Sequence, residues 1–132
     1  MNYFDEIEFL NREEENSNRE KLNDDEIKII KAQYKNIPDE YLDYLKYIGW
    51  GSFLDCQFLV YGGLMTSSEL DIKTEDEKNN ELIFFGDNFS GDLTGFNLRK
   101  DNKVIEWLHD YDEIYETELT FGEYIRKQMG IN

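Results

Sequence analysis

Few residues of this chain belong to the types that carry enzyme chemistry. It has one histidine, His109, and one cysteine, Cys56. His109 precedes Asp110, and neighbouring side chains point to opposite faces of an extended chain, so this pair is not expected to act as a catalytic dyad. Cys56 has no histidine near it in the sequence that would activate a thiolate. No serine stands in a Gly-x-Ser-x-Gly turn. The sequence therefore favours a protein that is not an enzyme.

The segment 87–92 offers the carboxylate and amide oxygens that calcium prefers. It departs from an EF-hand loop, because Phe89 occupies the third position and Leu98 the twelfth, where ligands are required. A tetrahedral zinc site lacks its cysteines and histidines. We therefore expect no metal and no cofactor. Three residues are expected to supply the unusual backbone angles of a tight loop between strands: Gly86, Asn88 and Gly91.

Charge is the most informative property of the composition. The 132 residues include 30 acidic and 14 basic side chains, a net charge of −16. This balance disfavours nucleic acids and anionic membranes, since both attract Lys and Arg. It favours a basic protein partner, whose approach an acidic surface accelerates. Acidity that serves only solubility is the alternative. We expect no nucleic-acid or membrane partner, and a monomer or weak dimer.

Several loops and strand ends combine carboxylates with large aromatic side chains. An aromatic anchor ringed by carboxylates is typical of a surface that holds a basic protein. In the alternative interpretation, Trp50 and Tyr61 belong to the core and the carboxylates are merely solvated. The predicted partner-binding residues are Trp50, Asp55, Tyr61, Asp87, Asp92, Asp110 and Asp112.

Hydrophobic periodicity predicts the elements that position these residues. Apolar residues recur at helical spacing between Ile37 and Ile48, which predicts a helix with Leu45 in the middle of its buried face. Pro38 suits the first helical position, and Gly49 is suited to ending the helix.

Other elements follow from capping residues and apolar runs. Asn23 with Glu26 and Thr120 with Glu123 have the spacing of capping boxes, so each pair is expected to open a helix. A short helix is expected around residues 7–10. Strands are expected at 57–61, 82–85, 93–98 and 104–108, the first ended by Gly62-Gly63 and the second buried on both faces.

The order of these elements is helices, a meander of strands and a closing helix. It predicts an α+β fold, a mainly antiparallel sheet packed with helices. The length fits a single domain, in which residues 1–23 form an N-terminal helix and a polar loop and residues 24–132 form the core. The lone cysteine and the absence of a signal pattern or a long apolar run favour a soluble cytoplasmic protein.

Five motifs follow one another in a recognisable order. They are Ile37-Pro38 with Tyr41 and Gly49, then 60–63 (Val-Tyr-Gly-Gly), 84–93, 104–107 and 120–125. Together they resemble the SUKH superfamily of Smi/Knr-type domains, from about Asp24 to Met129. The resemblance implies the same α+β fold. It also implies a bacterial immunity protein that neutralises a toxin, often a nuclease. A regulatory or scaffold domain, as in fungal members, is the alternative.

Overall fold

The computed structural model describes residues 3–12, 19–53, 57–70, 72, 81–100 and 103–131. The helices of this part of the chain are α1 (Phe4–Asn11), α2 (Asp24–Gln33), α3 (Asp39–Tyr47) and α4 (Phe121–Met129). The strands are β1 (Gly51–Phe53), β2 (Phe58–Thr66), β3 (Leu82–Asp87), β4 (Leu93–Asn97), β5 (Val104–Leu108) and β6 (Glu113–Glu116).

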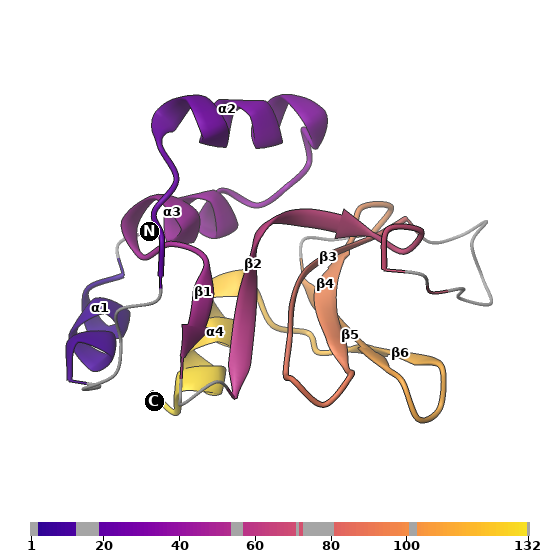
Figure 1. Cartoon of the computed structure of the whole chain (residues 1–132). Coiled ribbons are helices and arrows are strands. Elements are labelled where there is room, and N and C mark those ends of the chain that lie inside the picture. The colour runs from indigo at the N-terminus through magenta and orange to yellow at the C-terminus, as the bar shows by residue number, and fades with distance from the viewer. Residues whose placement is uncertain are drawn as a thin grey trace.

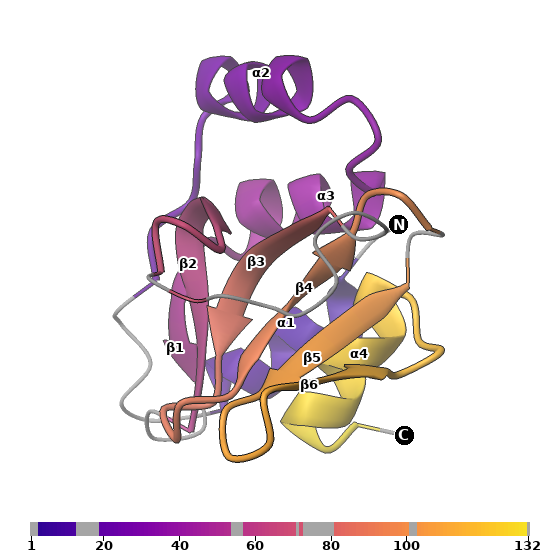
Figure 2. The same ribbon diagram turned by 90° about the vertical axis from the view of Figure 1, so that its right-hand side faces the viewer.

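The six strands form one antiparallel meander in the order β1-β2-β3-β4-β5-β6 (Figure 1). Helices α1, α3 and α4 lie behind this sheet in Figure 2, and α2 lies above it. The predicted α+β single domain is confirmed. β3 is an interior strand, and its residues 83–86 are buried, as its continuous apolar run predicts.

The main core lies between the sheet and the three helices that cover it. Its aromatic centre is Phe121, whose ring centroid lies 5.0 Å from that of Phe85 and 5.4 Å from that of Tyr41. Edge-to-face geometry at these distances adds to the energy of burial alone. Leu45 has an exposed fraction of 0%, so its predicted place in the core is confirmed.

Local sequence signals account for most helix ends. Asn23 and Thr120 both form complete capping boxes, with Glu26 and Glu123 as partners. Gly49 ends α3 with a φ of 100°, which favours glycine. The prediction for Pro38 was wrong by one position: its ψ of 139° is extended, so it is the N-cap residue rather than the first helical residue. Its carbonyl still accepts a hydrogen bond from the Tyr41 N–H, as an N-cap carbonyl should.

The predicted strands are present, with two corrections. β2 does not end at Gly62-Gly63 but runs on to Thr66, because a register shift between Val60 and Met65 lets the chain pass through the glycines without ending the pairing. Gly86 belongs to β3 and is not among the residues with positive φ. It is required for close approach, since a Cβ there would lie 2.3 Å from the Leu59 carbonyl oxygen.

The N-terminal helix is packed onto the rest of the domain. Glu6 is buried and accepts a hydrogen bond of 2.6 Å from Arg126 on α4. The Tyr3 hydroxyl donates to the Glu40 carbonyl oxygen, and the Tyr3 ring meets that of Tyr44 edge-on at 5.7 Å. Residues 13–18, which belong to the predicted polar loop, and residues 73–80 lie outside the described residues.

Candidate partner-binding site

The two faces of the sheet differ in what covers them. Helices α1, α3 and α4 pack on one face, and none of the described helices covers the other, which points to the viewer in Figure 2. We call this second side the helix-free face. A smaller apolar cluster lies there, built around Phe84, Leu93 and Ile105. Leu70 and Ile72, from the segment after β2, pack against it.

Strand register places one carboxylate within an apolar row on the helix-free face. Directly paired positions run across five strands, and the cross-strand row consists of Leu59, Asp87, Leu93, Trp107 and Ile114. Residues that pair across a ladder stand side by side on the same face of a sheet. Asp87 is therefore flanked by Leu59 and Leu93 in the middle of the sheet. Its position at the end of β3 would by itself suggest a solvated residue.

At one margin of this face lies a shallow depression of about 280 Å³. Its lining residues are Trp50, Leu59, Tyr61, Gly62, Gly63, Met65 and Leu70. The polar side-chain atoms of this set are the Tyr61 hydroxyl and the Trp50 indole nitrogen. The depression is thus an apolar, aromatic surface, of the kind that anchors a partner's side chain.

Tyr61 joins the depression to the cross-strand row. Its hydroxyl donates a hydrogen bond of 2.8 Å to Oδ2 of Asp87. Burial, and after it the hydrogen bond to the Asp87 carboxylate, raises the pKa of Tyr61 above its usual value. Oδ1 of Asp87 accepts from the Phe89 N–H at 2.9 Å. Both of these partners of Asp87 are neutral, and among the described residues no basic side chain pairs with it.

The loops after β3 and β5 lie together at one end of the sheet, and we call residues 88–92 and 109–112 the loop end (Figure 2). Asp92 joins them: its Oδ1 accepts from the His109 N–H at 3.1 Å and lies 2.7 Å from His109 Nδ1. His109 Nε2 lies 3.0 Å from Asp110 Oδ1. The prediction that His109 and Asp110 point apart was wrong, because both residues lie in a turn and not in an extended strand.

Electrostatics reinforce the contact between the two loops. The hydrogen bond that His109 donates to the Asp92 carboxylate raises the pKa of His109 above its usual value, and the charge of Asp110 adds to the effect. Desolvation alone would raise the pKa of Asp92, but hydrogen bonds from His109 and Asn88 outweigh it and the pKa is lowered. The arrangement therefore favours an imidazolium held between two carboxylates.

Two aromatic side chains project from the loop end into solvent. Phe89 is 52% exposed and Tyr111 is 72% exposed. Phe89 has a φ of 64°, a conformation that costs energy for a residue with a Cβ. Asp112 also has a positive φ, of 47°, and its Oδ1 accepts from the Trp107 indole N–H at 2.8 Å. Exposed aromatics surrounded by carboxylates are the arrangement expected of a surface that holds a basic protein.

The family model described as the SMI1 / KNR4 family (SUKH-1) matches residues 21–127. The chain belongs to this family. The match covers all of the sheet, α2, α3 and most of α4, while α1 precedes it. SUKH-1 is known for immunity-type domains that are in general non-enzymatic. Searches of curated proteins and of solved structures returned no match.

Within this SUKH-1 domain, the structure gathers the predicted site residues into two connected groups. Trp50 and Tyr61 line the depression and Asp87 accepts a hydrogen bond from Tyr61 at its margin, while Asp92, Asp110 and Asp112 lie at the loop end. The hairpin β3–β4 connects the two groups. Asp55, like Cys56, lies outside the described residues.

Sequence reasoning missed the apolar residues of the helix-free face as site members. The predicted strands contain Leu59 and Trp107, and the sequence assigns no element to Met65 or Ile114. A usable signal was present in the alternation of residues 104–108, which places Ile105 and Trp107 on one face. The sequence alone does not show that this face, with Ile105 and Trp107, is the helix-free face. That assignment requires the register of the strand pairs.

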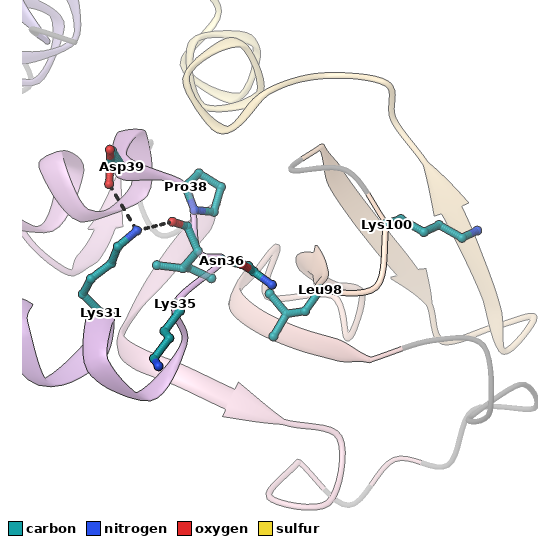
Figure 3. Close-up of a pocket in the computed structure, with 8 residues that line it drawn as sticks. Lys31, Lys35, Asn36, Pro38, Asp39, Leu98 and Lys100 are labelled. Atoms are coloured by element: carbon teal, nitrogen blue, oxygen red, sulfur yellow. Dashed lines mark hydrogen bonds and ion pairs between the residues drawn. The ribbon is translucent and has the colours of Figure 1, made fainter.

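A second depression, of about 370 Å³, lies among α2, the start of α3 and the turn after β4 (Figure 3). Three lysines contribute to its lining: Lys31, Lys35 and Lys100. Lys31 Nζ donates to the Ile37 carbonyl oxygen at 3.3 Å, and Lys100 forms an ion pair of 2.6 Å with Glu116. Figure 3 shows the three ammonium groups pointing in different directions. Because they do not converge, we assign no anion site to this depression.

The described residues also bear on metal sites and membrane spans. No group of three or more His, Cys, Asp or Glu side chains in this part of the chain is arranged to hold a metal ion. No helix in the same ranges is long and apolar enough to cross a bilayer.

Proposed function

We propose that this SUKH-1 protein is a cytoplasmic immunity protein that binds a basic toxin, often a nuclease in such systems, and blocks its active site. The observation that carries the proposal is the loop end, where Asp92, Asp110 and Asp112 accompany the exposed rings of Phe89 and Tyr111. Family membership supports a binding role, and the net charge of −16 supports a basic partner.

Inhibition would occur by occlusion. A nuclease holds phosphates with Lys and Arg, and the carboxylates of the loop end would pair with those same cations. Aromatic side chains would add apolar contact area beside the charges. The inhibitor needs no catalytic group for this mechanism, which agrees with a sequence that has only one histidine and one cysteine. It also needs no metal of its own.

The size of a stable interface favours a contribution from the helix-free face. A typical specific complex buries about 1,600 Å² in total, with some 20–30 residues from each partner. The loop end has nine residues, since it comprises 88–92 and 109–112. A partner seated on it would extend over the adjoining cross-strand row, where Trp107 and Ile114 are only partly buried. An apolar centre with a charged rim would result, as in other interfaces.

Co-purification with the product of an adjacent toxin gene tests the proposal. The parent protein should retain the toxin domain and protect cells that express it. A variant carrying Phe89→Ser and Tyr111→Ser removes the exposed rings of the loop end and should bind and protect less well. Ile29→Ser, which removes a similarly exposed apolar side chain from α2, is the matched control and should behave like the parent. Full binding by the double variant would overturn the proposed surface.

A further inference from the structure

The depression beside Tyr61 has features that specify one kind of side chain. Trp50 lines it, and Gly62, which is exposed, lies beside the indole ring: a Cβ at Gly62 would lie 3.4 Å from that ring. The same exposed glycine would allow a flat group to rest on the indole. At the neighbouring Gly63 a Cβ would meet nothing within 4 Å.

A carboxylate stands at the margin of this aromatic surface. Asp87 is hydrogen-bonded to the Tyr61 hydroxyl at 2.8 Å and pairs in register with Leu59, and both Tyr61 and Leu59 line the depression. The partners of Asp87 are the neutral Tyr61 O–H and Phe89 N–H, which leave its negative charge uncompensated among the described residues. The depression thus combines apolar walls with two aromatic rings, and an unneutralised carboxylate stands at its margin.

An arginine side chain matches each of these features. Its aliphatic stem can lie along Leu59 and Met65, its planar guanidinium can stack on an indole or phenol ring, and its charge can pair with a carboxylate. A purely apolar side chain would leave Asp87 without a cationic partner. A lysine would make the charge contact without the planar stacking.

We propose that the depression lined by Trp50, Tyr61 and Met65, with Asp87 at its margin, is a socket for one arginine side chain of the partner protein. This inference rests on the proposed binding function and adds the residue type that the partner presents. The socket gives that arginine a fixed position relative to the loop end, through the hairpin β3–β4. Recognition would then depend on the partner's shape as well as on its charge.

An NMR titration with N-acetyl-arginine methylamide tests the socket without a protein partner. The indole N–H signal of Trp50 is the reporter, and a Trp107→Phe variant assigns it. The arginine probe should produce saturable shifts at Trp50, Gly62 and Gly63, with a Kd on the order of 1–10 mM, since one side chain makes few contacts. The citrulline analogue, which is neutral and similar in shape, should bind at least about fivefold more weakly. The lysine analogue should fall between them.

Two variants define the socket further. Gly62→Leu covers the ring of Trp50 and should abolish the shifts, while the spectrum of the unliganded protein keeps its dispersion. Asp87→Asn keeps an acceptor for the Tyr61 hydroxyl but removes the charge, so arginine affinity should fall to about that of the citrulline probe. Asp25→Asn, an exposed substitution on α2, removes an equal charge and should change nothing.

The possible results separate the socket from the proposed function. Equal binding of the arginine and citrulline probes, or shifts that survive Gly62→Leu, would overturn the socket. If probe binding is as described but the toxin binds the Phe89 and Tyr111 double variant normally, the socket stands and the loop-end proposal fails. If the toxin requires the loop end while the arginine probe leaves Trp50 unshifted up to about 100 mM, ten times the upper expected Kd, the socket alone is wrong.

Discussion

The replacement Leu45→Ala should destabilise the protein severely. Leu45 lies on α3 and has an exposed fraction of 0%. Burial of a leucine side chain contributes about 1.5–3 kcal/mol, and the cavity left by truncation adds to the loss. The carbonyl oxygen of Leu45 also accepts from the Leu22 N–H at 3.0 Å, which ties the backbone at this point and limits collapse into the cavity. We therefore expect a loss of about 3–5 kcal/mol.

Urea denaturation of the parent and the variant measures this loss. At an m-value of about 2 kcal/mol/M, typical for small proteins, the midpoint should fall by roughly 1.5–2.5 M. The control is Ile29→Ala on α2, which truncates an aliphatic residue that is 66% exposed and should stay within about 0.5 kcal/mol of the parent. A loss below about 1 kcal/mol for Leu45→Ala would place the residue outside the core and refute the assigned face of α3.

Three further predictions concern single contacts. Thr120→Ala removes the N-cap of α4 and should cost about 1 kcal/mol in a thermal or urea titration, whereas Thr120→Ser should cost little. Glu6→Ala leaves Arg126 without its buried partner, so it should lower the Tm more than Glu8→Ala, an exposed change on the same helix; equal Tm values would contradict this. The His109–Asp92 contact should stabilise the protein most between about pH 4 and 6.5. Because the pKa of His109 is raised on folding, its contribution is complete below the pKa of the unfolded state and is lost as the pH rises through the pKa of the folded state. Because the pKa of Asp92 is lowered on folding, its contribution is complete above the pKa of the unfolded state and is lost as the pH falls through the pKa of the folded state. An NMR titration that places the pKa of His109 at or below 6.5 would refute it.

Much of the fold could be predicted because it depends on local signals. Capping boxes at Asn23 and Thr120 require only residues three positions apart, and both are present. The buried face of α3 follows from helical spacing, and the interior position of β3 follows from its continuous apolar run. Each of these features is complete within a short stretch of chain, so a sequence can show it.

The parts that could not be predicted depend on pairing between distant segments. β1 has only three residues and β6 only four, too few for a period to be recognised. β2 passes through Gly62 and Gly63 because of the register shift beyond Val60, and glycines in a sequence usually indicate an end.

The candidate site, too, could be predicted only where it depends on local signals. The sequence identified the type of surface, carboxylates with aromatics, and Trp50, Tyr61 and Asp87 do lie together. It did not show that Asp92 holds His109, which is 17 residues away along the chain. Nor did it show that Asp87 lies within an apolar row, because this position depends on the register of β2, β3 and β4.

The central claim, that the acidic loop end steers and binds a basic partner, is tested most directly by association kinetics. The rate constant for association with the toxin domain that co-purifies with the protein would be measured from low to high salt, for the parent and for Asp110→Asn with Asp112→Asn. These changes remove two charges and keep the acceptor oxygen for Trp107. The control variant, Asp25→Asn with Glu8→Gln, also removes two negative charges, one from α2 and one from α1.

Association of the parent should slow as the Debye length shrinks from about 10 Å at 0.1 M salt to about 3 Å at 1 M. At low salt the Asp110 and Asp112 variant should associate on the order of threefold more slowly, while the control variant stays close to the parent. An association rate that does not change with salt, or an equal loss in both variants, would contradict a role for the loop end.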